Sequence, residues 1–194
     1  MAAFIYIRDV YDACDDLKLA RLVEIFGSES IFIADSADPP VHIVNAVNVF
    51  MRKDIDLEIA PVIFMGTGVG GFYANYFAQK WDCPCVLINP EPEPSRAFTD
   101  ASLIEKHIRV NNKFDEADIR KLESMEREVR AIQSGVLVNL FVSPRDICTA
   151  RSLEVSTYKY TNYTKVLNEG THAAFGSFDL VIDWVKKGIL AVPP

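Results

Sequence analysis

Short apolar runs alternate with longer amphipathic segments along most of this 194-residue chain. Six runs are rich in β-branched and aromatic residues and predict strands, at residues 4–8, 30–34, 62–65, 85–88, 136–142 and 164–167. Between them, apolar residues recur at helical spacing over 15–26, 41–52, 178–190 and from a glycine-rich turn to about residue 81. Because the strands are apolar nearly throughout, both faces of their sheet must be covered. The pattern predicts an α/β protein, a three-layer α/β/α sandwich with a mostly parallel sheet.

The pattern changes between residues 100 and 133. Two segments there, 100–110 and 115–133, are highly charged and helical in spacing, and no strand separates them. We expect one domain over 1–194, in which 100–133 is a helical insertion over one end of the sheet, like the cap of an enzyme. The alternative is a pair of ordinary crossover helices, and the sequence does not separate the two.

Composition narrows the class of protein. Hydrophobic residues make up 49% of the chain, enough to bury a core, and the formal net charge of −7 argues against a nucleic-acid-binding surface, which is normally basic. The four cysteines form no CxxC pair, which favours buried free thiols in a reducing compartment. No apolar run reaches the roughly 18 residues that span a membrane, and charge appears at Arg8, too early for a secretory signal. We expect a cytoplasmic protein that uses no cofactor or metal ion and binds neither nucleic acid nor membrane. The sequence is compatible with a homo-oligomer as well as with a monomer.

A glycine-rich turn is the most informative motif in the chain. An apolar strand runs into Gly66-Thr67-Gly68-Val69-Gly70 and then into a helix. This is the layout of the G-x-S-x-G nucleophile elbow, in which a sharp strand-to-helix turn presents a serine. Gly68 stands at the serine position, and the glycines on either side relieve crowding around the apex. Thr67 precedes the apex, so its side chain is expected to point away from the pocket.

The same turn fits a second motif. Gly66, Gly68 and Gly71 satisfy the dinucleotide fingerprint G-x-G-x-x-G, and Glu91 follows the next strand, where a ribose-binding acid belongs. However, that fingerprint belongs to the first βα turn of its fold, and about two βα units precede this one. Glu91 also lies in the Pro-rich segment 90–94, which is consistent with a rigid exposed loop. Dinucleotide binding is therefore the second alternative.

Two downstream residues fit the remaining members of a catalytic triad. In hydrolases built around the elbow, the acid and the histidine follow the nucleophile in chain order. Asp146 comes just past a predicted strand, and His172 lies in a loop between the last strand and the last helix. The order Gly68, Asp146, His172 thus matches Ser, Asp, His at two of three positions. Each residue alone has a plainer interpretation, Asp146 as a helix N-cap and His172 as an ordinary loop residue.

Together these motifs resemble the small single-domain bacterial esterases of the YqiA type, a group of the α/β-hydrolase fold. Residues 66–74 resemble that family's elbow, G-S-S-L-G-G-F-Y-A, and 86–90 its V-L-I-N-P strand end. Asp146 stands where the family has a G-D-E acid turn, and 168–175 resemble its E-G-G-D-H-S-F histidine loop. The resemblance runs from end to end, with a first strand at 4–8, and it implies the α/β-hydrolase fold.

The departures from the family fall on its chemistry. Gly68 replaces the nucleophile serine, and Arg8-Asp9 stands where the family has His-Gly near the oxyanion hole. Loss of a triad serine costs about 10⁶ in kcat. We therefore expect a non-catalytic esterase homologue that binds a protein or a small acyl- or ester-like ligand. The alternative is an active carboxylesterase with a non-standard nucleophile, or one whose Gly68 replaces a native serine. The expected binding residues are Arg8, Asp9, Gly66, Thr67, Val69 and Gly70.

Overall fold

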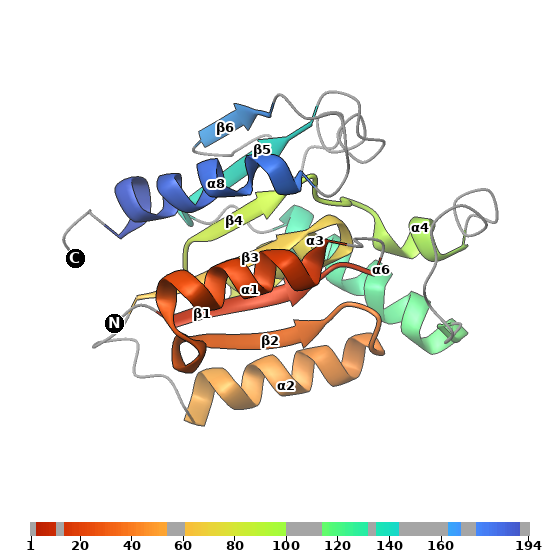
Figure 1. Ribbon diagram of the computed structural model, residues 1–194. Coiled ribbons are helices and arrows are strands. Elements are labelled where there is room, and N and C mark those ends of the chain that lie inside the picture. The colour runs from red at the N-terminus through yellow and green to blue at the C-terminus, as the bar shows by residue number, and fades with distance from the viewer. Residues whose placement is uncertain are drawn as a thin grey trace.

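A six-stranded sheet with helices on both faces makes up the described part of the protein (Figure 1). The computed structural model describes residues 3–10, 14–53, 61–99, 114–131, 135–143, 163–167 and 174–190. The strands are β1 (Ala3–Arg8), β2 (Ile31–Asp35), β3 (Val62–Thr67), β4 (Cys85–Ile88), β5 (Val138–Val142) and β6 (Tyr163–Val166). The α-helices are α1 (Asp15–Phe26), α2 (Pro40–Lys53), α3 (Gly68–Trp81), α4 (Pro94–Thr99), α6 (Glu116–Ala131) and α8 (Phe178–Trp184).

The order of the strands places the glycine turn at the centre of the sheet. The order is β2-β1-β3-β4-β5-β6, and every neighbouring pair is parallel. The chain moves outward from β1 to β2 and then crosses back to β3, so the direction of strand addition reverses between β1 and β3. Ligands of open α/β sheets bind at the carboxyl ends of the strands beside such a switch point. Ile7 pairs with Gly66 in register, so the ends of β1 and β3 meet at this point.

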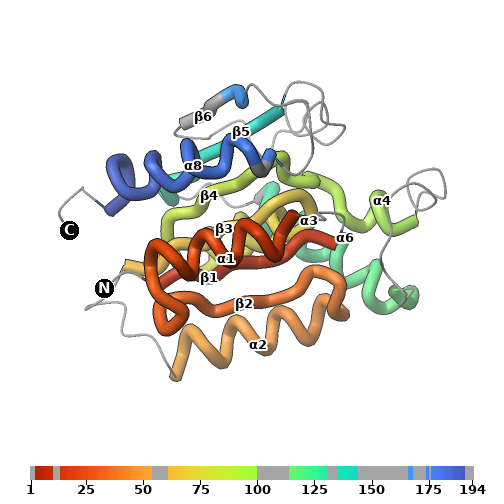
Figure 2. The backbone as a smooth tube through the Cα atoms, in the orientation of Figure 1, coloured from red at the N-terminus to blue at the C-terminus, as the bar shows by residue number. Residues whose placement is uncertain are grey.

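The strands alternate their side chains between two hydrophobic layers. Ile5 and Ile7 of β1 face a core formed with α2, α3 and α6, whereas Phe4 and Tyr6 face a core formed with α1 and α8. Figure 2 shows the same arrangement along the backbone, with α1 and α8 on one side of the sheet. The predicted three-layer α/β/α sandwich and its parallel sheet are therefore confirmed.

The helices and loops agree with the sequence pattern except at the last helix and in the Pro-rich segment. The last helix was expected to run over 178–190, but the α-helix α8 ends at Trp184 and a π-helical segment, Val185–Ile189, follows it. The Pro-rich segment 90–94 was consistent with an exposed loop, but most of it is buried and its last proline begins α4. Of the expected insertion, α6 packs against α2, α3 and α4, while residues 100–113 lie outside the described residues. Within the described ranges, no helix combines the length and the apolar character that crossing a membrane requires.

Candidate functional site

The glycine turn joins β3 to α3 through a left-handed residue. Gly68 has a φ of +53°, a conformation that side chains rarely adopt, and it is buried. A Cβ atom on Gly66 would overlap the backbone of Gly70, and one on Gly70 would overlap the carbonyl oxygen of Ile7 on β1. The steric reason inferred for these two glycines is thus confirmed, because the start of α3 lies directly against its own strand and against β1.

A carboxylate fills the space above the apex of the turn. Asp9, the first residue after β1, accepts a hydrogen bond through Oδ1 from the Val69 backbone N–H at 2.9 Å. A Cβ atom on Gly68 would lie 2.5 Å from Asp9 Oδ2 and 2.6 Å from Oδ1. In the elbow, the N–H of the residue after the nucleophile is an oxyanion-hole donor. Asp9 therefore occupies both the place of a nucleophile side chain and the acceptor position at the Val69 N–H.

A buried polar network underneath holds Asp9 in place. The backbone N–H of Asp9 donates to Asp15 Oδ2, and the Tyr6 hydroxyl donates to Asp15 Oδ1 at 2.6 Å. Lys18 is fully buried; its Nζ lies 3.8 Å from Asp15 Oδ1 and donates to Thr67 Oγ1 at 2.8 Å. The hydroxyl of Thr67 is thus directed toward α1. Buried charges persist where they are paired in this way, so the ion pair fixes the ends of β1 and β3 to α1.

Arg8, a predicted binding residue, is engaged elsewhere. Its guanidinium forms an ion pair with Asp16 at 2.7 Å on the surface of α1. Surface ion pairs of this kind contribute little to stability, about 0–1 kcal/mol. Of the Arg8-Asp9 pair, the structure therefore brings only Asp9 to the elbow.

The turn after β4 connects the elbow to the end of β5. Asn89 has a φ of +42°, and its side chain accepts from the Ser143 N–H at 2.7 Å and donates to Ser143 Oγ at 3.1 Å. Two residues on, the Glu91 N–H donates to the carbonyl oxygen of Gly68 at 2.8 Å. Ser143 directly precedes the segment that carries Asp146, so Asn89 fixes the point from which the predicted acid loop begins.

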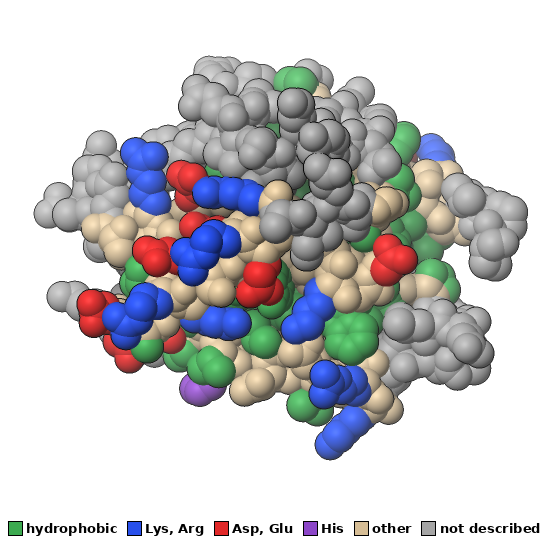
Figure 3. Space-filling view, turned by 180° about the vertical axis from the view of Figure 1, so that it is seen from behind, with side chains coloured by type: hydrophobic (Ala, Val, Ile, Leu, Met, Phe, Trp, Pro, Cys, Tyr) green, Lys and Arg blue, Asp and Glu red, His purple; other side chains and the backbone are tan. Residues whose placement is uncertain are grey.

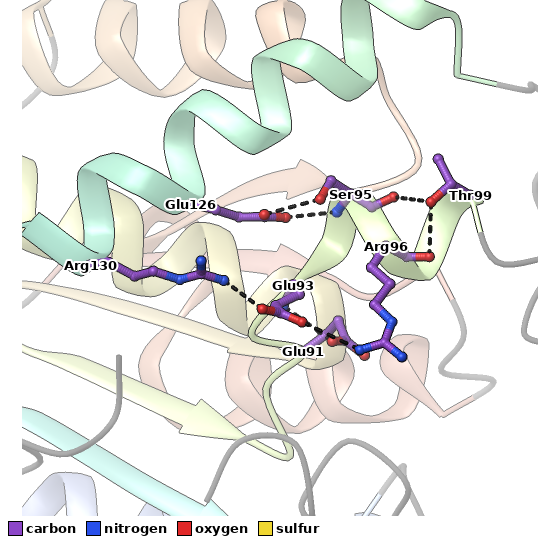
Figure 4. A network of polar contacts seen from close by, with 7 residues as sticks. All are labelled: Glu91, Glu93, Ser95, Arg96, Thr99, Glu126 and Arg130. Carbon is purple, nitrogen blue, oxygen red and sulfur yellow. Dashed lines mark hydrogen bonds and ion pairs between the residues drawn. The ribbon is translucent and has the colours of Figure 1, made fainter. Parts of the chain in front are cut away.

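The remainder of this turn is anchored beneath α6 (Figure 4). Ser95 donates to Glu126 through its backbone N–H at 2.8 Å and its hydroxyl at 3.0 Å, and Arg130 pairs with Glu93 at 2.6 Å. Burial raises the pKa of the Glu126 carboxyl, and the hydrogen bonds from Ser95 oppose that effect. Glu91 is itself buried, and its Oε1 accepts from the Glu93 N–H at 3.2 Å. This anchoring explains why the segment is not the exposed loop that its prolines suggested.

Asp146 and His172, the predicted triad acid and histidine, lie outside the described residues. The chain enters the first of these segments from Ser143 at the end of β5 and leaves the second at Ala174, which is buried and has a φ of +47°. Their roles therefore stay predictions.

Two cysteines lie far from the turn. Cys83 and Cys85 flank the start of β4, whereas the elbow lies at the carboxyl ends of the strands. Burial raises the pKa of both thiols, that of Cys83 to about 11. Neither thiol therefore provides a thiolate nucleophile at neutral pH. Among the residues that the structure places, no group of histidine, cysteine and acidic side chains is arranged to hold a metal ion.

The family comparison covers most of the chain, including the glycine turn. The model of the uncharacterised protein family UPF0227 matches residues 18–187. The chain belongs to this family. A comparison with curated protein sequences finds no match.

Solved structures with the same fold are α/β-hydrolases. Est1E from Butyrivibrio proteoclasticus is similar with a TM-score of 0.65 and 17% identity, over 97% of this chain and 87% of its own. Alpha/beta hydrolase domain-containing protein 10 from mouse has a TM-score of 0.65 and 13% identity, over 95% and 90%. An esterase domain from a Rhodothermus marinus protein has a TM-score of 0.60 and 13% identity, over 96% and 87%. This UPF0227 chain therefore has the α/β-hydrolase fold.

The geometry of the turn disfavours the dinucleotide alternative. The fingerprint glycines lie at the end of β3, the third strand in chain order, and at the start of α3, and Gly66 and Gly70 serve the packing of α3 against β3 and β1. A phosphate at the start of α3 would meet the carboxylate of Asp9, which already accepts from the Val69 N–H. The side chain of Glu91 is buried, and its Oε1 accepts from the Glu93 N–H.

The sequence analysis missed three features of this site: the position of Asp9 against the apex, the buried Lys18–Asp15 pair and the Asn89–Ser143 hydrogen bonds. Only the second leaves a signal in the sequence. Lys18 precedes Leu22 by four residues, so it lies on the same face of the helix as a core leucine. An Asp three residues before that lysine indicates a partner for a buried charge.

Proposed function

We propose that this protein is a non-catalytic α/β-hydrolase homologue that acts by binding a protein or a small ligand at the elbow. The position of Asp9 carries the proposal. Ester hydrolysis at an elbow requires a nucleophile at the apex and N–H donors free to hold the developing oxyanion. Gly68 has no side chain, and the Val69 N–H is bonded to the Asp9 carboxylate. Both requirements are therefore unmet at the same place.

The expected loss of rate is large. Removal of a triad serine costs about 10⁶ in kcat, and removal of one oxyanion-hole donor costs about 10²–10³. A fixed carboxylate about 4 Å from a developing oxyanion adds about 4 kcal/mol of repulsion at an effective dielectric constant of about 20. That energy corresponds to about 10³ in rate. We therefore expect ester turnover at the background rate.

The first experiment measures hydrolysis of p-nitrophenyl acetate by the wild-type protein, His172→Ala and Asp9→Asn. All three should match the rate without protein. Turnover that disappears in His172→Ala would support the active-esterase alternative and end the proposal. Turnover that disappears in Asp9→Asn would identify Asp9 as a non-standard nucleophile, with the same consequence.

The second experiment tests whether Asp9 blocks the apex. Gly68→Ser alone should stay inactive, because the new side chain meets the Asp9 carboxylate. Asp9→Gly combined with Gly68→Ser clears that space, and any restored turnover should be confined to this double variant. Asp9→Gly with Gly68→Ala is the matched control without a hydroxyl. Turnover above background that is equal in Gly68→Ser with and without Asp9 would show that the carboxylate does not block the site.

Binding itself is tested by thermal shift with short-chain esters and the corresponding alcohols. A ligand held at the elbow should raise the Tm of the wild-type protein and should lose much of that effect in Asp9→Asn. The size of the shift follows from the ratio of ligand concentration to Kd. An equal shift in both proteins would place the ligand elsewhere.

A further inference from the structure

Two hydroxyl groups in the core have no hydrogen-bond partner among the described residues. Tyr73 of α3 and Ser36, the first residue after β2, are both fully buried, yet neither side-chain oxygen is bonded to any atom that the structure places. Nearly all buried polar groups in folded proteins are hydrogen-bonded, and those that are not indicate a bound water molecule, ion or ligand. The two hydroxyls therefore require a partner from outside the chain.

Both hydroxyls belong to one region, at the end of β1. The Ser36 N–H donates to the carbonyl oxygen of Arg8 at 3.1 Å. The same carbonyl oxygen would lie 2.9 Å from a Cβ atom on Gly70, so α3 approaches it closely. Tyr73 follows Gly70 by three residues and thus lies on the same face of α3. The Arg8 carbonyl group therefore lies between Ser36 and the face of α3 that carries Tyr73.

Two carboxylates lie nearer the surface in the same region. Asp38 is exposed in the turn between β2 and α2, and Asp118 is partly exposed in the first turn of α6. This turn and the start of α6 lie at the same end of the sheet (Figure 1), and in the view from behind acidic side chains gather at the margin where α6 begins (Figure 3). Burial raises the pKa of the Tyr73 hydroxyl well above its ordinary value, and the charges of Asp118 and Asp38 raise it further. Both carboxylates are therefore within electrostatic reach of the buried Tyr73 oxygen.

We propose that Tyr73, Ser36, Asp38 and Asp118 bind the primary ammonium group of a small ligand. An ammonium group has three N–H donors and no acceptor. It can donate to both hydroxyl oxygens at the inner end of the site and keep a third donor for a carboxylate at the outer end. An anion would be repelled by both carboxylates, and a neutral donor would lack the charge-assisted hydrogen bonds, which are about twice as strong as neutral ones.

The neighbouring side chains favour a short alkyl chain on the ammonium group. Ala37 and, at the start of α6, Phe114 and Ile119 pack against the same core as Tyr73. They flank the two carboxylates in the sequence, so a ligand that enters between the carboxylates meets apolar surface. A divalent metal ion is less well suited, because the part of the chain that the structure describes offers no group of three histidine, cysteine or acidic side chains to bind it. The site uses none of the elbow residues, so it goes beyond the function proposed above.

The experiment is isothermal titration calorimetry of the full chain at pH 7 with n-butylammonium chloride, over a concentration series in the millimolar range. The wild-type protein should bind it saturably, whereas n-butanol and sodium chloride at the same concentrations should give no binding isotherm. Tyr73→Phe and Ser36→Ala should each raise Kd at least about tenfold, because each removes a hydrogen bond to a charged group. Asp38→Asn combined with Asp118→Asn should do the same, since asparagine keeps the shape of the side chain and removes only its charge.

Tyr76→Phe and Asp183→Asn are the matched controls. Tyr76 lies on the same helix as Tyr73, but its hydroxyl donates to Glu128 at 3.1 Å, and Asp183 is an exposed acid on α8, across the sheet. Both variants should keep the wild-type Kd. Without amine, Tyr76→Phe should lower the Tm because it loses a hydrogen bond, whereas Tyr73→Phe should not, because its hydroxyl has none to lose.

A parallel titration with Nα-acetyl-lysine amide distinguishes two sources of the same chemistry. Tighter binding of n-butylammonium would identify a free amine, and tighter binding of the lysine derivative a lysine side chain of a protein partner. The proposal is overturned if neither amine binds saturably, or if n-butanol binds as tightly as n-butylammonium. It is equally overturned if Tyr73→Phe keeps the wild-type Kd, or if this variant lowers the Tm without amine as much as Tyr76→Phe does.

Discussion

Placing a serine on the apex glycine tests the central contact of the site. Gly68 has a φ of +53°, where a side chain costs about 1–2 kcal/mol. Its Cβ would lie 2.5 Å from Asp9 Oδ2, so the carboxylate must move and release the Val69 N–H. A buried donor left without its acceptor costs about 1–3 kcal/mol. Gly68→Ser should therefore lower the free energy of unfolding by about 2–5 kcal/mol.

Urea denaturation of four proteins separates the two causes. The wild-type protein, Gly68→Ser, Asp9→Gly and the double variant form a double-mutant cycle. The backbone strain at position 68 does not depend on Asp9, whereas the collision between the new side chain and the carboxylate does. Gly68→Ser should therefore lower the free energy of unfolding by about 1–3 kcal/mol less when Asp9 is already glycine. Gly68→Ala adds the same Cβ without a hydroxyl and should show the same coupling. If the destabilisation of the double variant equals the sum of the two single variants to within about 0.5 kcal/mol, the contact between Asp9 and the apex is refuted.

Three further predictions concern the surroundings of the elbow. Lys18→Met should lower the free energy of unfolding, measured by urea denaturation, by about 3–5 kcal/mol, because it leaves the buried Asp15 carboxylate without its counter-charge. The exposed control Lys53→Met should change it by less than about 0.5 kcal/mol. Asn89→Ala should destabilise more than Asn89→Gly in the same assay, since both lose the hydrogen bonds to Ser143 but only glycine accepts a φ of +42° without strain. Burial raises the pKa of Glu126 above 4.5, so the folded protein keeps this proton to higher pH than the unfolded chain, and ionisation lowers stability as the pH rises through the folded pKa. Glu126→Gln should therefore gain stability relative to the wild-type protein as the pH rises above 4.5, and a difference that does not change with pH would contradict the assignment.

Local physics made most of the fold predictable from the sequence. Each strand is a short apolar run and each helix an amphipathic one, and these patterns depend on neighbours only a few residues away. The Pro-rich segment was misinterpreted for the opposite reason. Its burial depends on Ser95 and Glu93 meeting Glu126 and Arg130 of α6, more than thirty residues along the chain. Nothing within the segment itself records that contact.

In the site, too, features set by neighbouring residues were predictable and contacts between distant residues were not. The role of the glycines on either side of the apex was predictable because a tight strand-to-helix turn needs them whatever surrounds it. The position of Asp9 was not, since it lies sixty residues before Val69 and reaches it only because β1 and β3 are neighbours in the sheet. Strand order follows from the packing of the whole chain, and the carboxyl ends that it brings together can be named only once it is known.

Gly68 and Asp9 therefore form one structural unit at the elbow. A side chain at position 68 and the carboxylate of Asp9 exclude each other, because they require the same space. If Asp9 were absent, the Val69 N–H would lose the acceptor that it now has. If position 68 carried a side chain, that side chain would displace the Asp9 carboxylate from the Val69 N–H. Each residue is compatible with the fold because of the other. Serine at position 68 alone consequently collides with the Asp9 carboxylate, whereas serine at position 68 combined with glycine at position 9 removes the collision and frees the Val69 N–H in one step.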